Sequence, residues 1–189
     1  MPGHLAGRAH VYGHNVDTDV LYPGRYLMVT DTAEMALHAA EDLDPEFRAR
    51  VQEGDIFVAG RNLGCGSSRE QAVVALKSAG IRALVCASAA RIFFRNAINQ
   101  GLPILRVGDA YDEIAERVST GDPLEVDLAT GIITHPATGS HWQAEALPPF
   151  LRELLDSGGL LPHLKRRIEA QKAAQAAVVT SGGTSDGNA

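Results

Sequence analysis

Cysteine is scarce in this chain: among 189 residues there are two, Cys65 and Cys86. They do not form a CxxC motif, and a chain of this size in a reducing compartment needs no disulfide. Two cysteines are also too few to hold a four-iron cluster through cysteine alone, even one with an open iron site and three ligands. If the protein works with such a cluster, another chain must hold most of it.

Long apolar runs and a basic excess are missing too. No apolar run reaches the roughly 18 to 20 residues that a membrane span needs, and the first ten residues lack the apolar core of a secretory signal. The net charge of −6 disfavours a nucleic-acid partner, because such domains concentrate Lys and Arg. Local cations such as Arg69, Arg91 and Arg95 remain available for a small anion. We therefore expect a cytoplasmic protein with no membrane or nucleic-acid partner.

The pattern of elements predicts one α/β domain over residues 1–172, followed by a disordered tail over 173–189. Apolar residues make up 45% and charged residues 21%, which is ordinary for a globular chain. Strands that alternate with helices of this length indicate a sheet with crossovers. The expected strands are 5–11, 55–59, 83–87 and 102–107, with a hairpin at 124–135; the expected helices are 32–40, 68–79, 90–99, 148–155 and 162–171.

The most informative stretch is a glycine-rich loop at residues 60–66 that runs from a predicted strand into a helix. Backbone N–H groups at a helix start lack intrahelical partners and lie at the positive end of the helix dipole. Gly64 and Gly66 let the backbone approach an anion closely. Ser67, Ser68 and Arg69 add hydroxyl and guanidinium donors. The loop therefore predicts a carboxylate or phosphate site.

The same residues also fit a purely structural role. Ser67 with Glu70, or Ser68 with Gln71, matches the capping-box spacing, and strand–loop–helix junctions are common. No Lys follows the glycines as in a Walker loop, and the G-x-S-x-G elbow of hydrolases is missing. From the residues alone, a structural cap and an anion site both stay open.

Three sequence blocks carry a family resemblance. Residues 64–72 (GCGSSREQA) resemble the signature of the aconitase swivel domain. Residues 15–19 (NVDTD) with 23–27 (PGRYL) resemble the opening of the small subunits of 3-isopropylmalate dehydratase and homoaconitase, and residues 90–103 (ARIFFRNAINQGLP) resemble a third block of these proteins. The blocks stand in family order and together cover roughly residues 8 to 107. Gln71 departs from the pattern, since many members have His there, so it receives no role.

The resemblance implies a swivelling β/β/α domain that is active only with a large subunit, whose three cysteines hold a [4Fe–4S] cluster. The cluster acts as a Lewis acid, and the small subunit closes over it and supplies the base. By motif match Ser67 is that base, and Ser68, Arg69 and the helix-start N–H groups stabilise its alkoxide. Gly66, Ser68 and Arg69 also match substrate contacts. Asp19 matches a catalytic aspartate directed towards a His or Arg; without the match it reads as a turn cap.

The segment after Pro23-Gly24 is where the family distinguishes substrates. Homoaconitase-type chains carry Arg at the position of Met28, whereas this chain has Leu27, Met28 and Val29 there. An apolar pocket favours an alkyl group and leaves a third carboxylate unpaired. The resemblance therefore implies isomerisation of 2-isopropylmalate and 3-isopropylmalate in leucine biosynthesis. The alternative is a purely structural role, in which these three residues only pack in the hydrophobic core.

Other functions stay open. One is a small subunit of a related dehydratase, of the homoaconitase or dimethylmalate type. Another is a stand-alone anion-binding module without catalysis. A serine hydrolase is more distant, because it needs a His and an acid near Ser67.

Overall fold

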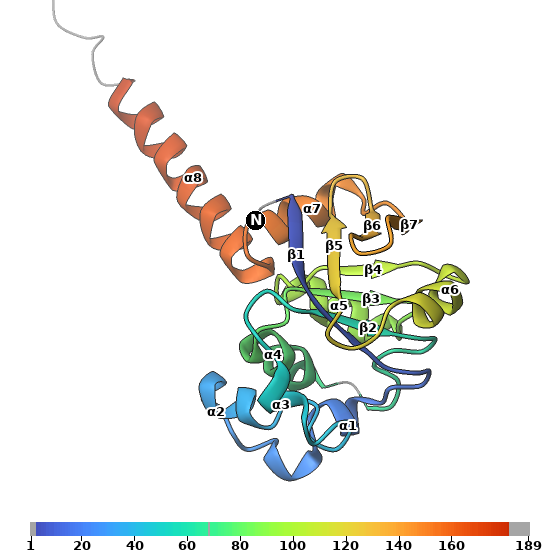
Figure 1. Ribbon diagram of the computed structural model, residues 1–189. Helices are drawn as coiled ribbons and strands as arrows, with labels where there is room; N and C mark the ends of the chain where they lie inside the picture. Colours follow the sequence, from blue (N-terminus) through green and yellow to red (C-terminus); the bar gives the residue numbers. More distant parts are fainter. Residues whose placement is uncertain (1–2, 68, 182–189) are drawn as a thin grey trace, which may run out of the picture.

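The computed structural model describes residues 3–67 and 69–181. Its centre is a seven-stranded mixed sheet in the order β4-β3-β2-β1-β5-β6-β7 (Figure 1). The α/β prediction is confirmed. The strands are β1 (His4–Val11), β2 (Ile56–Ala59), β3 (Ala83–Cys86), β4 (Ile104–Arg106), β5 (Pro123–Asp127), β6 (Ile132–His135) and β7 (Ser140–Gln143).

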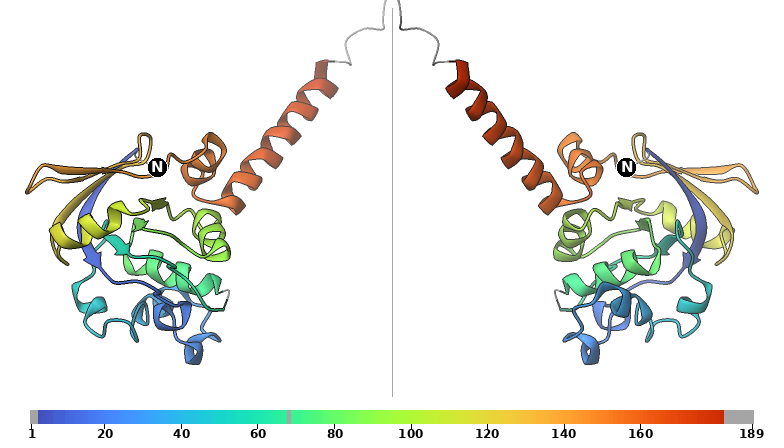
Figure 2. Two further views of the ribbon diagram at one scale, coloured as in Figure 1. Left: turned by 90° about the vertical axis from the view of Figure 1, so that its right-hand side faces the viewer. Right: turned by 90° about the vertical axis from the view of Figure 1, so that its left-hand side faces the viewer.

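Strand β1 divides the sheet into two halves. It pairs in parallel with β2, and β2, β3 and β4 continue in parallel. On its other side β1 pairs antiparallel with β5, and β5, β6 and β7 form an antiparallel meander. All residues of β2 and β3 are buried, as expected for parallel strands covered on both faces. The β6–β7 hairpin extends from the body on the side away from α8 (Figure 2).

Alternate residues of β2 and β3 point into two separate apolar cores. Phe57 and Leu84 belong to the larger core, and Ile56 and Val85 belong to the smaller one, as the two-residue period of a strand requires. Helices cover the larger core, whereas α6 and the antiparallel strands cover the smaller one. The helices are α1 (Thr18–Leu21), a 3₁₀ helix (Gly24–Tyr26), α2 (Thr32–Leu37), α3 (Phe47–Arg50), α4 (Glu70–Ala79), α5 (Arg91–Asn99), α6 (Ala110–Arg117), α7 (Pro149–Asp156) and α8 (Leu160–Ser181).

Helix α8 is longer than the sequence analysis predicted. It leaves the body of the molecule (Figure 2) and continues to Ser181, whereas we expected the closing helix to end at 171 and a tail without regular structure to start at 173. Four of the residues 173–177 are Ala, which has the highest helix propensity. Residues 182–189 of the predicted tail lie outside the described residues. No helix in the described part of the chain is both long and apolar enough to cross a membrane.

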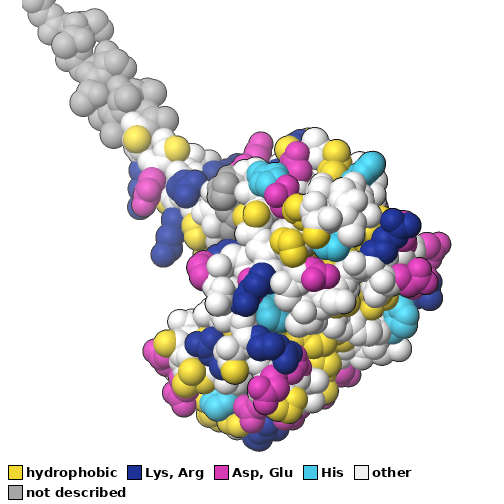
Figure 3. Space-filling model, viewed as in Figure 1, with side chains coloured by type: hydrophobic (Ala, Val, Ile, Leu, Met, Phe, Trp, Pro, Cys, Tyr) yellow, Lys and Arg dark blue, Asp and Glu magenta, His cyan; other side chains and the backbone are white. Residues whose placement is uncertain are grey.

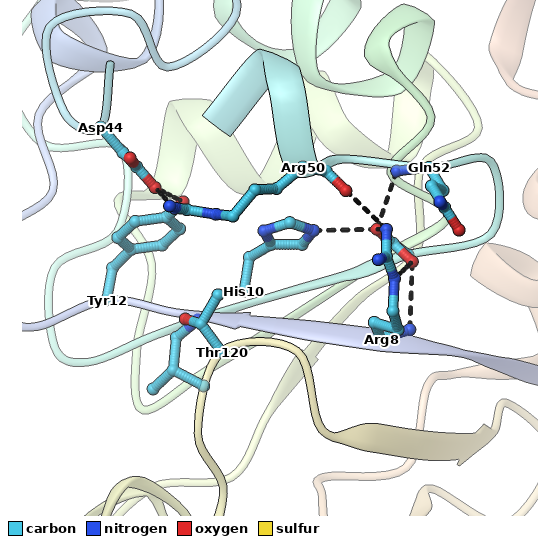
Figure 4. Close-up of polar contacts among 9 residues, drawn as sticks. Arg8, His10, Tyr12, Asp44, Arg50, Gln52 and Thr120 are labelled. Atoms are coloured by element: carbon cyan, nitrogen blue, oxygen red, sulfur yellow. Dashed lines mark hydrogen bonds and ion pairs between the residues drawn. The ribbon is translucent and has the colours of Figure 1, made fainter. Parts of the chain in front are cut away.

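The buried carboxylate of Asp55 ties β1 to the chain just before β2. Figure 4 labels three of the residues around it, Arg8, His10 and Gln52. Asp55 Oδ2 accepts hydrogen bonds from Gln52 N (2.8 Å) and Arg8 Nη2 (3.1 Å), and it lies 2.9 Å from His10 Nε2. Oδ1 accepts from Arg8 N at 3.1 Å. His10 and Asp55 are each 2% exposed. The carboxylate therefore satisfies donors from both segments and helps to fix how β1 and β2 lie against each other.

The surface carries no broad basic patch on the face that Figure 3 shows. Lys and Arg side chains on that face lie among Asp and Glu side chains (Figure 3). Around α2, for example, Arg25 Nη1 and Nη2 each lie 2.7 Å from an oxygen of Asp42. This mixed surface differs from that of a duplex-binding domain, where Lys and Arg side chains cluster on one face.

Candidate functional site

The segment after β1 lies alongside the loop after β2. Gly64 N donates to Val16 O (2.8 Å), and Thr18 N donates to Cys65 O (3.0 Å). Asp17 and Cys65 form an isolated parallel bridge. Because β1 and β2 are parallel neighbours, the two segments that follow them emerge at the same edge of the sheet. The sequence blocks that begin at residues 15 and 64 therefore lie side by side.

The third block closes over the other side of this loop. Leu63 N donates to Ser88 O, and Ala90 N donates to Leu63 O, both at 2.9 Å. Gly64 has a φ of +72°, and a Cβ there would lie 2.1 Å from the Phe93 ring. Only glycine fits this contact with the first turn of α5. All three blocks thus converge on residues 63–66.

Gly66 makes the turn that presents Ser67. Its φ is +91°, and an added Cβ would lie 2.4 Å from the carboxylate oxygens of Asp17. Asp17 in turn caps α1, because its Oδ1 accepts from Asp19 N at 2.8 Å. Ser67 is exposed, and its carbonyl accepts a hydrogen bond from Thr18 Oγ1 at 2.7 Å. Ser68, which we also predicted to bind substrate, lies outside the described residues.

The predicted capping box of Ser67 and Glu70 is wrong. Helix α4 begins at Glu70, and its N-cap is Arg69, in an extended conformation with no side-chain cap. Ser67 lies before the cap, in a turn held by Thr18. The pair of Ser68 and Gln71 involves a residue outside the described part. Among the described residues, no side chain is hydrogen-bonded to the first N–H groups of α4 as a cap, so these donors face the loop.

Arg69 forms an ion pair with Asp19. The Arg69 side chain is 17% exposed and that of Asp19 is 57% exposed. Arg69 Nη1 also donates to Tyr22 O at 3.4 Å. A Cβ on Gly24 would lie 3.7 Å from Arg69 Nη2, so the guanidinium lies against the Pro23-Gly24 turn. Asp19 and the turn together fix its direction and leave it other donors for a carboxylate.

A pocket of about 240 Å³ lies where these elements meet. The starts of α4 and α5 border it, and neither N-cap residue, Arg69 or Ala90, makes a side-chain cap hydrogen bond. Two helix N-termini, Arg69 and Arg91 border the pocket and offer donors to a carboxylate, while Asp19 pairs with the Arg69 guanidinium. Arg91, which the sequence offered without a clear role, lies here, whereas Arg95 does not. The lining residues are Thr18, Gly64, Gly66, Arg69, Ala90, Arg91, Ile92 and Phe93.

The predicted specificity segment does not line this pocket. Leu27 and Val29 are half-buried and pack against the larger core, so the core alternative describes their contacts. Met28 is 92% exposed. The structure therefore separates Met28, which is free to meet a ligand or partner, from its two neighbours. Tyr26, which precedes them, is stacked on His38 with ring centroids 3.6 Å apart.

Sequence reasoning missed the roles of Asp17 and Thr18 in holding the turn. Both residues lie inside the sequence block at residues 15–19, and this was the one signal that pointed to them. The sequence does not show which backbone groups their side chains contact. Cys65 is half-buried and Cys86 is buried, and both are free thiols. Burial raises the pKa of Cys86 to about 12. Within residues 3–67 and 69–181, no group of three or more His, Cys, Asp or Glu side chains is placed to hold a metal ion.

Comparison with known proteins agrees with these features. A family model described as the aconitase C-terminal domain matches residues 4–109. The 3-isopropylmalate dehydratase small subunit of Moorella thermoacetica is 47% identical over 165 residues, covering 87% of this chain and 97% of that protein. That of Thermodesulfovibrio yellowstonii is 45% identical over 167 residues, covering 88% and 97%. The crystal structure of a 3-isopropylmalate dehydratase from Methanocaldococcus jannaschii is similar with a TM-score of 0.83 and 42% identity, over 90% of this chain and 99% of that one.

Proposed function

This chain belongs to the aconitase C-terminal domain family, and from that premise we propose that it is the small subunit of a 3-isopropylmalate dehydratase. As such it is part of a hydro-lyase that interconverts 2-isopropylmalate and 3-isopropylmalate in leucine biosynthesis. The observation that carries the proposal is the convergence of three sequence blocks on one pocket, bordered by Arg69 and Arg91, next to the Ser67 turn. The relatives that bear this name match over nearly their whole length.

The residues of this chain do not fit a four-iron cluster of its own. Cys86 is fully buried in β3, which leaves Cys65, and the described residues hold no group of three candidate ligands. We therefore assign the cluster to the large subunit, where it supplies Lewis-acid chemistry. This chain is then one part of a two-subunit enzyme that works in the cytoplasm.

Within that enzyme we assign this chain two tasks. Ser67 takes and returns the proton at the substrate carbon, and Arg69 binds a substrate carboxylate. A serine hydroxyl is a weak base, so its alkoxide needs strong stabilisation. The starts of α4 and α5 and the Arg69 guanidinium lie beside the turn and offer N–H donors to it. Asp19 supports the same site by holding Arg69.

The test is co-expression with a large subunit of a 3-isopropylmalate dehydratase, anaerobic cluster reconstitution and a panel of substituted malates. We expect a stable complex that turns over isopropylmalates. Turnover of a tricarboxylic or methyl-substituted malate instead would favour the related dehydratases. Tight binding of phosphate by the lone chain, with no large partner, would favour the anion-binding module. The hydrolase alternative lacks support, because no described histidine is hydrogen-bonded to Ser67.

We predict that Met28→Arg lowers kcat/KM for isopropylmalate about 100-fold, mainly through KM. Met28 is 92% exposed, so the substitution does not disturb the core of this chain. In the closed complex the guanidinium would face an alkyl group and lose its hydration without gaining a partner. Steady-state kinetics of the reconstituted complex measure the change.

The matched control for this prediction is Ile132→Arg, a change of an exposed apolar residue in β6 far from the pocket. Its kinetics should equal those of the parent. If Met28→Arg leaves alkylmalate turnover unchanged, Met28 does not contact the alkyl group of the substrate and does not set specificity.

We predict that Asp19→Asn raises KM about 10-fold and changes kcat less than threefold. The reason is that Arg69 loses its ion-pair partner and is no longer held in one direction. Glu113→Gln, which breaks a distant ion pair with Arg117 on α6, is the control. A drop in kcat at constant KM would instead assign Asp19 to the proton-transfer step.

A further inference from the structure

Thr18 is a buried polar residue directly beneath the Ser67 turn. It is 1% exposed, and its hydroxyl has three acceptors within 3.5 Å: Ser67 O at 2.7 Å, Cys65 O at 3.4 Å and Asp17 Oδ1 at 3.4 Å. A hydroxyl has one proton to donate. The carbonyl of Ser67 is by far the nearest acceptor, and it therefore receives the hydrogen bond.

The Thr18 hydroxyl is held in place by its own backbone. Thr18 N donates to Cys65 O at 3.0 Å, and Thr18 O accepts from Tyr22 N at 2.9 Å. A β-branched side chain has few χ1 options in a helix. The hydrogen bond to Ser67 thus starts from a fixed point on α1 and ends on the peptide group that carries the proposed base.

From these contacts we propose that Thr18 is a positioning residue for Ser67, an inference that rests on the proposed function. The hydrogen bond fixes the peptide plane after Ser67. That plane and the Gly66 turn together set the direction of the Ser67 Cα–Cβ bond. Thr18 acts on the proton transfer through Ser67, whereas Asp19, its neighbour on α1, acts on substrate binding through Arg69. One four-residue helix thereby aligns two different parts of the site.

Two substitutions test the hydroxyl separately from the shape of the side chain. Thr18→Val keeps the volume and branching but removes the donor, and Thr18→Ser keeps the donor. In the reconstituted complex we expect Thr18→Val to lower kcat about 10- to 100-fold with KM within twofold, since small displacements of a reacting group have effects of this size. Thr18→Ser should stay within about threefold of the parent in kcat.

Thr18 also lines the pocket, so direct substrate contact is the competing explanation. A rise in KM at unchanged kcat for Thr18→Val would show that contact and overturn the positioning role. An equal loss in Thr18→Val and Thr18→Ser would also overturn it, because the hydroxyl would not be the cause. Thr120→Val is the matched control, since this hydroxyl also bonds a backbone group, Val11 N at 2.9 Å, but away from the loop.

Melting temperatures and yields of the complex separate misfolding from mispositioning. If Thr18→Val fails to assemble, Thr18→Ala serves as the second donor-free variant under the same criteria. Ser67→Ala tests the premise, that Ser67 is the base, separately from the positioning role of Thr18. An inactive Ser67→Ala with a fully active Thr18→Val refutes the positioning role and leaves the function standing. A Ser67→Ala complex at the parental rate refutes the assignment of Ser67 as the base, and the positioning role of Thr18 with it.

Discussion

Replacing Ser67 by Ala in the assembled enzyme is expected to lower kcat about 10³-fold, within the range that loss of a positioned acid–base group produces. The substitution removes the oxygen that we assign as proton acceptor. It leaves Gly66, the Arg69–Asp19 ion pair and the start of α4 in place. KM should therefore change little. Steady-state kinetics under anaerobic conditions, with iron content measured in the same samples, check the result.

The matched control for Ser67→Ala is Ser78→Ala, the same change at an exposed position near the other end of α4. It should retain parental kinetics. Ser67 is exposed, so its truncation creates no cavity in this chain, and equal melting temperatures are expected for both variants. Parental turnover by Ser67→Ala, with iron content unchanged, would remove the base from the mechanism.

The parallel half of the fold was predictable because its signals are local. Short apolar runs indicated β2 and β3, and both strands are buried throughout. Gly80 and Gly101 stand just past the predicted helices 68–79 and 90–99, and both have positive φ there. These signals depend on neighbours along the chain and on helix-ending chemistry, which a single sequence displays.

Short elements escaped prediction because distant contacts hold them. Helix α1 has four residues, too few to be stable alone, and its first N–H bonds Cys65 O, 47 residues away in sequence. Strand β7 also has four residues, and its Trp142 becomes buried only when β7 pairs with β6. Periodicity over such lengths carries little information.

For the candidate site, the sequence offered a set of residues but not their geometry. The resemblance selected Ser67, Arg69 and Asp19, and the structure places Asp19 against Arg69. The capping box failed because its spacing is local, whereas the carbonyl of Ser67 is held by Thr18 from another segment. Spacing cannot reveal such a partner. The three blocks meet because β1 and β2 pair as parallel neighbours, so the site depends on the alignment of these two strands.

That dependence makes Asp55 the position where a substitution should cost most stability. We expect Asp55→Asn to lower the free energy of unfolding by about 3 to 5 kcal/mol, the usual cost of removing one partner from a buried ion pair. The amide would turn a donor towards Arg8 and His10, which both need an acceptor. His10 Nδ1 is already buried without a partner in the described residues. Urea unfolding of the chain at pH 7 measures the loss, and Asp112→Asn, at an exposed surface pair, should change it by less than about 1 kcal/mol.

The pH dependence of the same variant decides whether the Asp55 charge is responsible. Burial raises the pKa of the Asp55 carboxyl, but hydrogen bonds from His10, Gln52 N and Arg8 outweigh burial and hold this pKa below its usual value. A depressed folded-state pKa contributes stability that is complete above the unfolded value of about 4 and is lost as the pH falls through the folded one. The parent should therefore lose stability below about pH 4 more steeply than Asp55→Asn, so that the two unfolding curves converge in acid. Parallel curves at all pH values would mean that Asp55 acts through its shape and not through its charge.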